Sequence, residues 1–257
     1  MSGPPVVLLH GMAGSHIYWG ADFDVLADRA RLIAVDLLGF GQSAKPVTGY
    51  GPREHADAVV GCLRELGITE PALLVGHSMG ALVALAVATH YPEAVDRVVA
   101  IAAPIYSSRA QGMRHIRAMG TLEGLMALGT MARLMCRWMC KHRALAARLA
   151  PLLEPSLPPA IARAGVQHTW ASYSQSMDEL ILSGHAPGAL AGTTRPVHLI
   201  VAVDDPVPEV AVQSRALAAN DLISMDIWPQ GGHHLPLTQP ARCLLAITEV
   251  LQPRAMR

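Results

Sequence analysis

The sequence of 257 residues is short of aromatic side chains and has no excess of either charge. Phe, Trp and Tyr make up 4% of the chain, so the core must be built from aliphatic residues and methionine. Lys plus Arg number 20, as do Asp plus Glu, which argues against an overall attraction to nucleic acid. Hydrophobic residues reach 51% and charged residues only 16%, a balance that excludes a disordered chain.

Cysteine is also scarce, and no two cysteines form a CxxC pair. Cys136 and Cys140 lie four residues apart in a helical pattern near His142, but zinc sites generally use closer pairs and four good ligands. We therefore expect no metal and no cofactor. Together with Cys62 and Cys243, these cysteines are expected to be reduced thiols of a cytoplasmic protein.

Secretory and membrane-spanning patterns are missing as well. The start "MSGPPVVLLHG" has no basic residue, and its apolar run is too short for a signal peptide. The apolar stretch 122–139 is interrupted by charged residues and glycines, which argues against a membrane span. We expect a cytoplasmic location.

Short β-branched runs alternate with helical patterns along most of the chain. Most of these runs are continuously apolar, as in strands covered on both faces. The alternation predicts an α/β fold, a mostly parallel sheet of about six strands with helices on both faces. The expected strands are 5–10, 31–37, 71–76, 96–102, 196–203 and 222–228, and the expected helices are 52–66, 79–90, 208–219 and 240–251.

Residues 105–187 break this alternation, because they contain helical patterns but no convincing strand. They are predicted to form a helical cap over the ends of the strands, inserted into a core made of 1–104 and 188–257. Segment 185–196 is expected to be a loop that leaves the cap. The cap holds eight Lys or Arg between Arg109 and Arg148 against one acid, and seven of the twelve methionines: Met113, Met119, Met126, Met131, Met135, Met139 and Met177.

The stretch "VGHSMGA" places Ser78 between an expected strand and an expected helix. This context is typical of a nucleophile elbow, a strained turn that exposes a serine hydroxyl. Gly76 and Gly80 fit it because a Cβ at either position would collide with the neighbouring strand or helix. The positive end of the helix after Ser78 also favours negative charge near the serine oxygen.

A serine nucleophile needs a base to take its proton and an acid to orient that base. His233 and His234 follow a Gly-Gly pair beyond the last expected strand, and His233 is favoured because Gly232 permits a close approach. For the acid, Asp205 is favoured because Pro206 fixes its turn, and Asp204 stays open as the rival.

Five motifs in order resemble those of the α/β-hydrolase superfamily, in which nucleophile, acid and histidine follow the order of Ser78, Asp205 and His233. The resemblance implies an oxyanion hole made by the backbone N–H groups of Met12 and Met79. The motifs are "LLHGMAGS" (8–15), "DLLGFGQS" (36–43), "GHSMG" (76–80), "DDPVP" (204–208) and "GGHHLPLTQP" (231–240).

Two features depart from the pattern of the superfamily. Its members usually carry an antiparallel strand pair before the "HG" strand, which here begins at Pro5. The sheet therefore has about six strands, or the chain has lost its start. The acid loop is also one residue shorter than usual between Asp205 and Pro208, which keeps Asp204 open as the acid.

These residues predict an enzyme, a carboxylesterase acting on small apolar esters with short to medium acyl chains. A serine nucleophile argues against haloalkane dehalogenases and epoxide hydrolases of this fold, which need a carboxylate there. The alternatives are a carbon–carbon bond (dienoate), lactone or thioester hydrolase on the same triad and, outside enzymes, a slow-turnover ligand receptor. His10 and His77 are expected to be structural. The oligomeric state stays open, a homodimer included.

Overall fold

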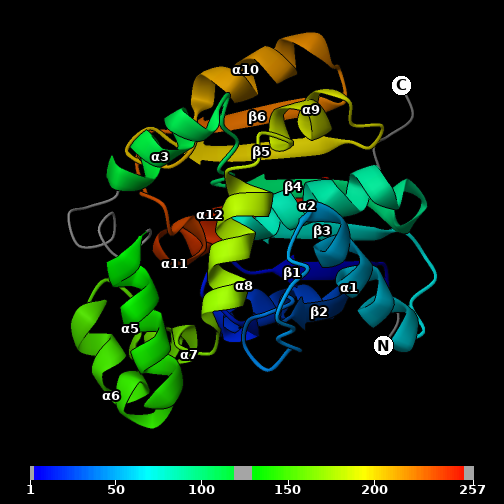
Figure 1. The fold of residues 1–257 in the computed structure, drawn as a ribbon. Helices are drawn as coiled ribbons and strands as arrows, with labels where there is room; N and C mark the ends of the chain where they lie inside the picture. Colours follow the sequence, from blue (N-terminus) through cyan, green and yellow to red (C-terminus); the bar gives the residue numbers. More distant parts are fainter. Residues whose placement is uncertain (1–2, 119–128, 252–257) are drawn as a thin grey trace.

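A six-stranded parallel sheet forms the centre of the protein in the computed structural model, which describes residues 3–118 and 129–251 (Figure 1). The strands lie in the order β2-β1-β3-β4-β5-β6, and every neighbouring pair is parallel. The predicted sheet is therefore confirmed. Its strands are β1 (Pro5–Leu9), β2 (Arg31–Val35), β3 (Ala72–His77), β4 (Val95–Ile101), β5 (Val197–Ala202) and β6 (Ile223–Trp228).

Helices cover both faces of the sheet because successive strand side chains point to opposite sides. Leu74 packs with α1 (Pro52–Glu65) and α2 (Met79–His90) in one hydrophobic cluster. Its neighbours Leu73 and Val75 belong to a second cluster, which includes residues of η2 and α12. The other elements outside the segment between β4 and β5 are η1 (His16–Trp19), η2 (Ala21–Asp28), η3 (Pro92–Ala94), α10 (Val210–Ala219), α11 (Leu235–Thr238) and α12 (Pro240–Leu251).

Between β4 and β5 the described chain is helical, as predicted, and α3, α5, α6 and α7 lie at the side where the strand arrows end (Figure 1). The division into a core and a cap at 105–187 stays a prediction. Residues 119–128, with Met119 and Met126, lie outside the described part. The elements are α3 (Arg109–Ala118), α5 (Thr130–Lys141), α6 (Arg143–Leu153), α7 (Pro159–Gly165), α8 (Trp170–Gln175) and η4 (Ser176–Ile181), a π-helical turn.

The prediction of a loop over 185–196 is wrong in part, because Ala186–Ala191 form the short helix α9. Its Leu190 is fully buried in the same cluster as residues of α2. Proline and two glycines made this segment read as a loop. Pro187 stands in the first turn, however, where its missing N–H costs nothing.

None of the described helices reaches the length and apolar character that crossing a bilayer requires. The cytoplasmic location stays a prediction.

Candidate active site

Ser78 stands at the junction of β3 and α2 with φ 52° and ψ −120°, a backbone conformation that L-residues rarely adopt. Its N–H donates to the carbonyl oxygen of Ile101 at the end of β4, over 2.8 Å, which holds the strained turn in place. The side chain is half-buried. Such strain is typical of functional positions, where the surrounding structure maintains it.

The two glycines of the motif allow three backbone segments to meet at this turn. A Cβ on Gly76 would lie 2.3 Å from the carbonyl oxygen of Gly80, at the start of α2. A Cβ on Gly80 would lie 2.1 Å from the carbonyl oxygen of Leu9, at the end of β1. Both contacts are with backbone atoms, so no side-chain movement can relieve them. The structure therefore confirms the collisions that were expected from the sequence.

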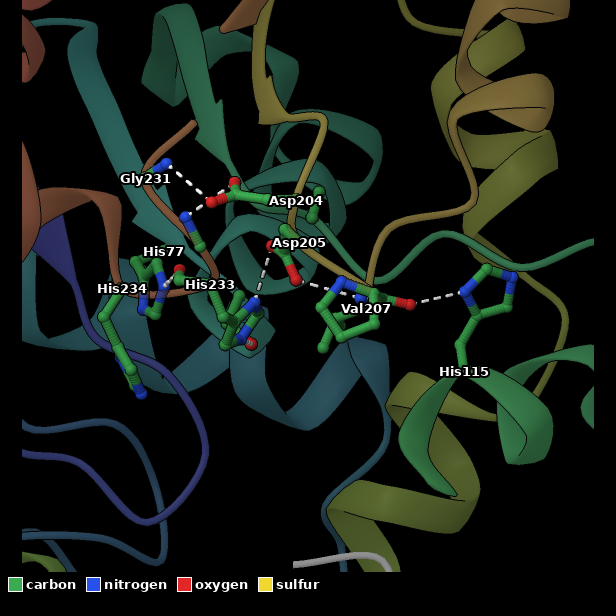
Figure 2. Close-up of polar contacts among 12 residues, drawn as sticks. His77, His115, Asp204, Asp205, Val207, Gly231, His233 and His234 are labelled. Atoms are coloured by element: carbon green, nitrogen blue, oxygen red, sulfur yellow. Dashed lines mark hydrogen bonds and ion pairs between the residues drawn. The ribbon is translucent and has the colours of Figure 1, made fainter. Parts of the chain in front are cut away.

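His233 reaches the serine from the loop between β6 and α11. Its Nε2 lies 3.0 Å from Ser78 Oγ. Its Nδ1 lies 2.9 Å from Asp205 Oδ2 (Figure 2). The Asp205 side chain is fully buried and that of His233 is 12% exposed. The structure thus brings together the serine, histidine and acid that the sequence predicted, in one line of hydrogen bonds.

The two neighbouring aspartates point in different directions. Asp205 accepts the N–H of Val207 through its second oxygen, at 2.9 Å, which fixes the carboxylate toward His233 (Figure 2). The exposed Asp204 instead accepts the N–H groups of Gly232 and Gly231, at 2.9 and 3.1 Å. These backbone hydrogen bonds lower the pKa of Asp204. Asp204 therefore holds the backbone of the loop before His233, whereas the imidazole is hydrogen-bonded to Asp205.

Tyr18 was not predicted from the sequence, but it contacts two histidines beside the triad, His77 and His234. Its ring stacks on His77 with centroids 4.7 Å apart, and its hydroxyl lies 3.1 Å from His234 Nδ1. His77 in turn donates its Nε2–H to the carbonyl oxygen of His233, over 2.8 Å. No motif marks Tyr18, because its partners are 59 and 216 residues away in the sequence.

His77 and His234 are neutral neighbours of His233. Burial lowers the pKa of His77 well below its usual value and that of His234 to about 4. Neutral rings at these two positions place no additional positive charge beside the His233 imidazole. His234 points to Tyr18 and not to Ser78, so of the two adjacent histidines only His233 meets the serine.

The two predicted oxyanion donors belong to α2 and to the loop after β1. Met79 opens α2, so its N–H has no acceptor within the helix. Across the described residues, no protein acceptor takes the N–H of Met12. The loop that carries Met12 touches the elbow, since a Cβ on Gly11 would lie 3.2 Å from Ser78 Cβ.

His10 fixes that loop as a structural residue. Its Nδ1 lies 2.7 Å from the carbonyl oxygen of Gly11, and its Nε2 accepts the N–H of Leu37 over 3.0 Å. These two bonds require a neutral ring that donates from Nδ1. Burial lowers the pKa of His10 to about 4, so the ring keeps that state at neutral pH.

Across residues 3–118 and 129–251, no three His, Cys, Asp or Glu side chains gather as they would to hold a metal ion. Cys136 is buried, which raises its pKa to about 12, and Cys140 Sγ lies 3.4 Å from the carbonyl oxygen of His168. His142 is exposed and packs beside Trp138.

Residues 4–123 match the family model described as alpha/beta hydrolase fold. Solved structures of this fold superpose on nearly the whole chain. One is E-2-(acetamidomethylene)succinate hydrolase, with a TM-score of 0.76, 23% identity and coverage of 96% of this chain and 91% of that one. The chain therefore has the α/β-hydrolase fold.

Two further relatives are more similar in sequence. The esterase RhEst1 from Rhodococcus sp. ECU1013 has 26% identity and a TM-score of 0.73, with 97% of this chain and 90% of that chain covered. The 2-(acetamidomethylene)succinate hydrolase of Mesorhizobium japonicum is 41% identical over 100 residues, which are 39% of this chain and 36% of the relative. The matched segments thus span about a third of the length of the curated relatives.

Proposed function

We propose that this protein of the α/β-hydrolase fold is a serine carboxylesterase that cleaves esters of short to medium acyl chains through an acyl-enzyme. The observation that carries the proposal is the hydrogen-bonded line from Ser78 Oγ through His233 to the buried Asp205, with distances of 3.0 and 2.9 Å. A serine on a strained elbow, a base and an orienting acid are the parts that acyl transfer requires.

In the first half of the reaction, Ser78 Oγ attacks the ester carbonyl carbon while its proton moves to His233 Nε2. Asp205 stabilises the imidazolium that forms and keeps Nε2 aimed at the serine. The carbonyl oxygen becomes an anion, which the N–H groups of Met12 and Met79 are proposed to receive. When the intermediate collapses, the ester C–O bond breaks and His233 gives its proton to the leaving alcohol.

Water completes the second half. His233 Nε2 takes a proton from water, whose oxygen attacks the acyl carbon of the Ser78 ester. The resulting anion occupies the same oxyanion hole, and collapse returns the proton to Ser78 Oγ as the carboxylic acid leaves. Each oxyanion donor contributes about 3 kcal/mol to lowering the barrier. No step needs a cofactor, since protein groups and water supply every proton.

A second candidate uses the same triad on a different acyl substrate. The relatives named 2-(acetamidomethylene)succinate hydrolase act, by that name, on a carboxylate-bearing compound that is not a simple ester. Carboxylate-bearing substrates should therefore be tested in parallel with the ester series, together with lactones, thioesters and dienoates. A panel of p-nitrophenyl acetate, butyrate and octanoate against 2-(acetamidomethylene)succinate, a lactone, a thioester and a dienoate separates these classes.

The catalytic assignment is tested by Ser78→Ala and by the pair His233→Ala and His234→Ala. The first two variants should lose ester turnover to the background rate, and His234→Ala should retain most of it, because only His233 contacts Ser78. Circular dichroism and urea unfolding check that each variant folds. Full activity in Ser78→Ala would refute the proposal, and slow turnover of every substrate by the native chain would favour a receptor.

The acid is tested by the matched pair Asp205→Asn and Asp204→Asn. Loss of the carboxylate that holds the histidine costs about 10⁴ in kcat, so Asp205→Asn should be nearly inactive. Asp204→Asn should lose about tenfold or less, because its oxygen can still accept one of the two glycine N–H groups. The assignment fails if Asp204→Asn is the more damaging change.

A further inference from the structure

Helices α5 and α6 bury small side chains and expose large ones. On α5 the buried residues are Ala132 and Cys136, and on α6 they are Ala146 and Ala150. The exposed apolar residues of the two helices are Met131, Leu134, Trp138, Leu145, Leu149, Leu152 and Leu153, with exposed fractions from 37% at Leu149 to 76% at Leu152. We call these seven residues the outer apolar face.

The seven residues follow helical spacing. Met131, Leu134 and Trp138 are three and four residues apart, as are the first residues of the α6 set, so each group forms one stripe along its helix. The helices contact each other and lie side by side, beyond the carboxyl ends of the strands (Figure 1). Apolar residues gathered in this way mark a surface that another apolar phase covers.

Cations border this face. Arg133, Arg137, Lys141 and Arg148 are exposed, and residues 129–153 contain no Asp or Glu. The imbalance is regional: the stretch from Arg109 to Arg148 holds eight of the 20 basic residues and one of the 20 acidic ones. Counted along the sequence, this stretch is net +7 and the rest of the chain is net −7. Five of its eight cations lie on α5 and α6, whereas Arg109 on α3 is paired with Asp178.

The excess of cations on α5 and α6 distinguishes between two partners that could cover this apolar face, a second copy of the chain and a lipid surface. A second copy that paired the same face across a two-fold axis would bring the two sets of α5 and α6 cations together, which like-charge repulsion opposes. An anionic lipid surface offers the complement, because its headgroups attract the cations while its acyl chains receive the leucines. Trp is also favoured at the boundary between headgroups and acyl chains.

We propose that the outer apolar face of α5 and α6 docks the protein on the surface of an anionic lipid bilayer. The leucines and Met131 enter the boundary region, Trp138 lies at headgroup depth, and the four exposed cations contact the lipid phosphates. Binding is peripheral and reversible. It is independent of the triad, so Ser78→Ala protein binds as the native chain does.

The test uses vesicles of phosphatidylcholine, with and without phosphatidylglycerol, in a flotation assay with the full chain. The native protein should float with the anionic vesicles, and added salt should release it. Trp138 gives a second readout, since Trp19 and Trp228 are buried and Trp170 is half-buried. Its fluorescence should shift to the blue on binding, and Trp138→Phe should abolish most of that shift.

Two surface variants separate the contribution of the cations to vesicle binding from that of the leucines. Replacing Arg133, Arg137 and Lys141 together by Gln should weaken partitioning about a hundredfold, at about fivefold for each cation. Leu134→Ser with Leu149→Ser should weaken it by about tenfold or more. The matched controls Arg215→Gln on α10 and Leu245→Ser on α12 change exposed residues outside the face and should bind normally.

Three outcomes overturn the proposal. Equal binding to vesicles without phosphatidylglycerol removes the role of charge, and unchanged binding by both face variants removes the face. Absence of vesicle binding, with a dimer in sedimentation velocity that the Leu134→Ser, Leu149→Ser variant converts to a monomer, assigns the face to a second copy. Urea unfolding of each variant ensures that a loss of binding is not a loss of fold.

Discussion

Helices α2 and α5 are each twelve residues long, but they are buried to very different extents. In α2 the ten consecutive residues from Met79 to Ala88 are buried, whereas α5 buries only Ala132 and Cys136. A helix that is apolar on all sides belongs in an interior, and α2 lies there, against β3 and β4 on one side and α1 on the other. The comparison separates a layer that stabilises the fold from a pair of helices that presents a surface.

The placement of the candidate site follows from this difference. Ser78, Asp205 and His233 follow strands β3, β5 and β6, so rigid parallel strands hold the positions from which they project. The helices α5 and α6 contribute none of these three side chains. Their substitution should therefore affect surface binding more than chemistry, while changes in the sheet layer should affect both.

The largest effect on stability is expected from acid, which protonates buried, neutral histidines of the sheet layer and of the inserted segment. Burial lowers the pKa of His10, His55 and His168 from 6.5 to about 4. The unfolded chain binds their protons first, so stability is complete above pH 6.5 and is lost as pH falls toward 4. At pH 5 each histidine costs about 2 kcal/mol, so the three together cost about 6 kcal/mol. The whole stability of a domain is about 5–15 kcal/mol.

Urea unfolding at pH 7 and pH 5 measures this loss. The variant His55→Gln keeps an amide group within reach of Ser176 but cannot take up a proton, so its loss between the two pH values should be about 2 kcal/mol smaller. An unfolding free energy that stays constant from pH 7 to pH 5 would contradict the assignment of neutral buried rings.

The sequence predicted the sheet layer well because its signals there are local. Strand bounds agree within two residues, since runs such as "VVLL" are buried on both faces and contain no competing pattern. The order of motifs also selected the three residues that the structure brings together. Pro206, directly after Asp205, was the signal that favoured Asp205 over Asp204. The structure gives the two aspartates different partners.

What the sequence did not predict depends on distant contacts or on which side of a helix faces solvent. Tyr18 meets His77 and His234 only through the fold. Periodicity predicted helices in the inserted segment. The sequence pattern does not show whether the apolar side of such a helix faces the core or the solvent. Met131, counted among the residues of an apolar cap, is 56% exposed. Small residues such as Ala132 and Ala146 form the buried side instead.

A smaller but still severe effect is expected for Gly80→Ala in the elbow. The new Cβ would stand 2.1 Å from the Leu9 carbonyl oxygen, so β1 or α2 must move, at a cost of about 3 kcal/mol. Gly61→Ala in α1 is the matched control, because nothing lies within 4 Å of its added Cβ. That change should stabilise the protein by about 0.5–1 kcal/mol. Chemical unfolding compares the two, and equal effects would mean that the elbow is loosely packed.

Overpacking the buried side of α6 should cost less, about 1–3 kcal/mol. Ala150 is 7% exposed and packs in a small cluster with Ala146, Ala162 and Val166, so Ala150→Leu must push α6 away from α7. The loss should appear as faster amide hydrogen exchange in 130–166 with little change in β3 and β4. Uniform exchange across both layers would show that they unfold as one unit.

The smallest expected effect is that of Leu134→Ala on the exposed side of α5. Leu134 is 58% exposed, so its removal forfeits little burial, and the unfolding free energy should change by less than about 0.5 kcal/mol. The same Leu→Ala change at Leu74, fully buried under α2, should cost about 2–5 kcal/mol. Both values come from one series of urea titrations. A loss of more than about 2 kcal/mol at Leu134 would mean that its side chain is packed within the protein, and the outer apolar face would then not be free to receive a lipid surface.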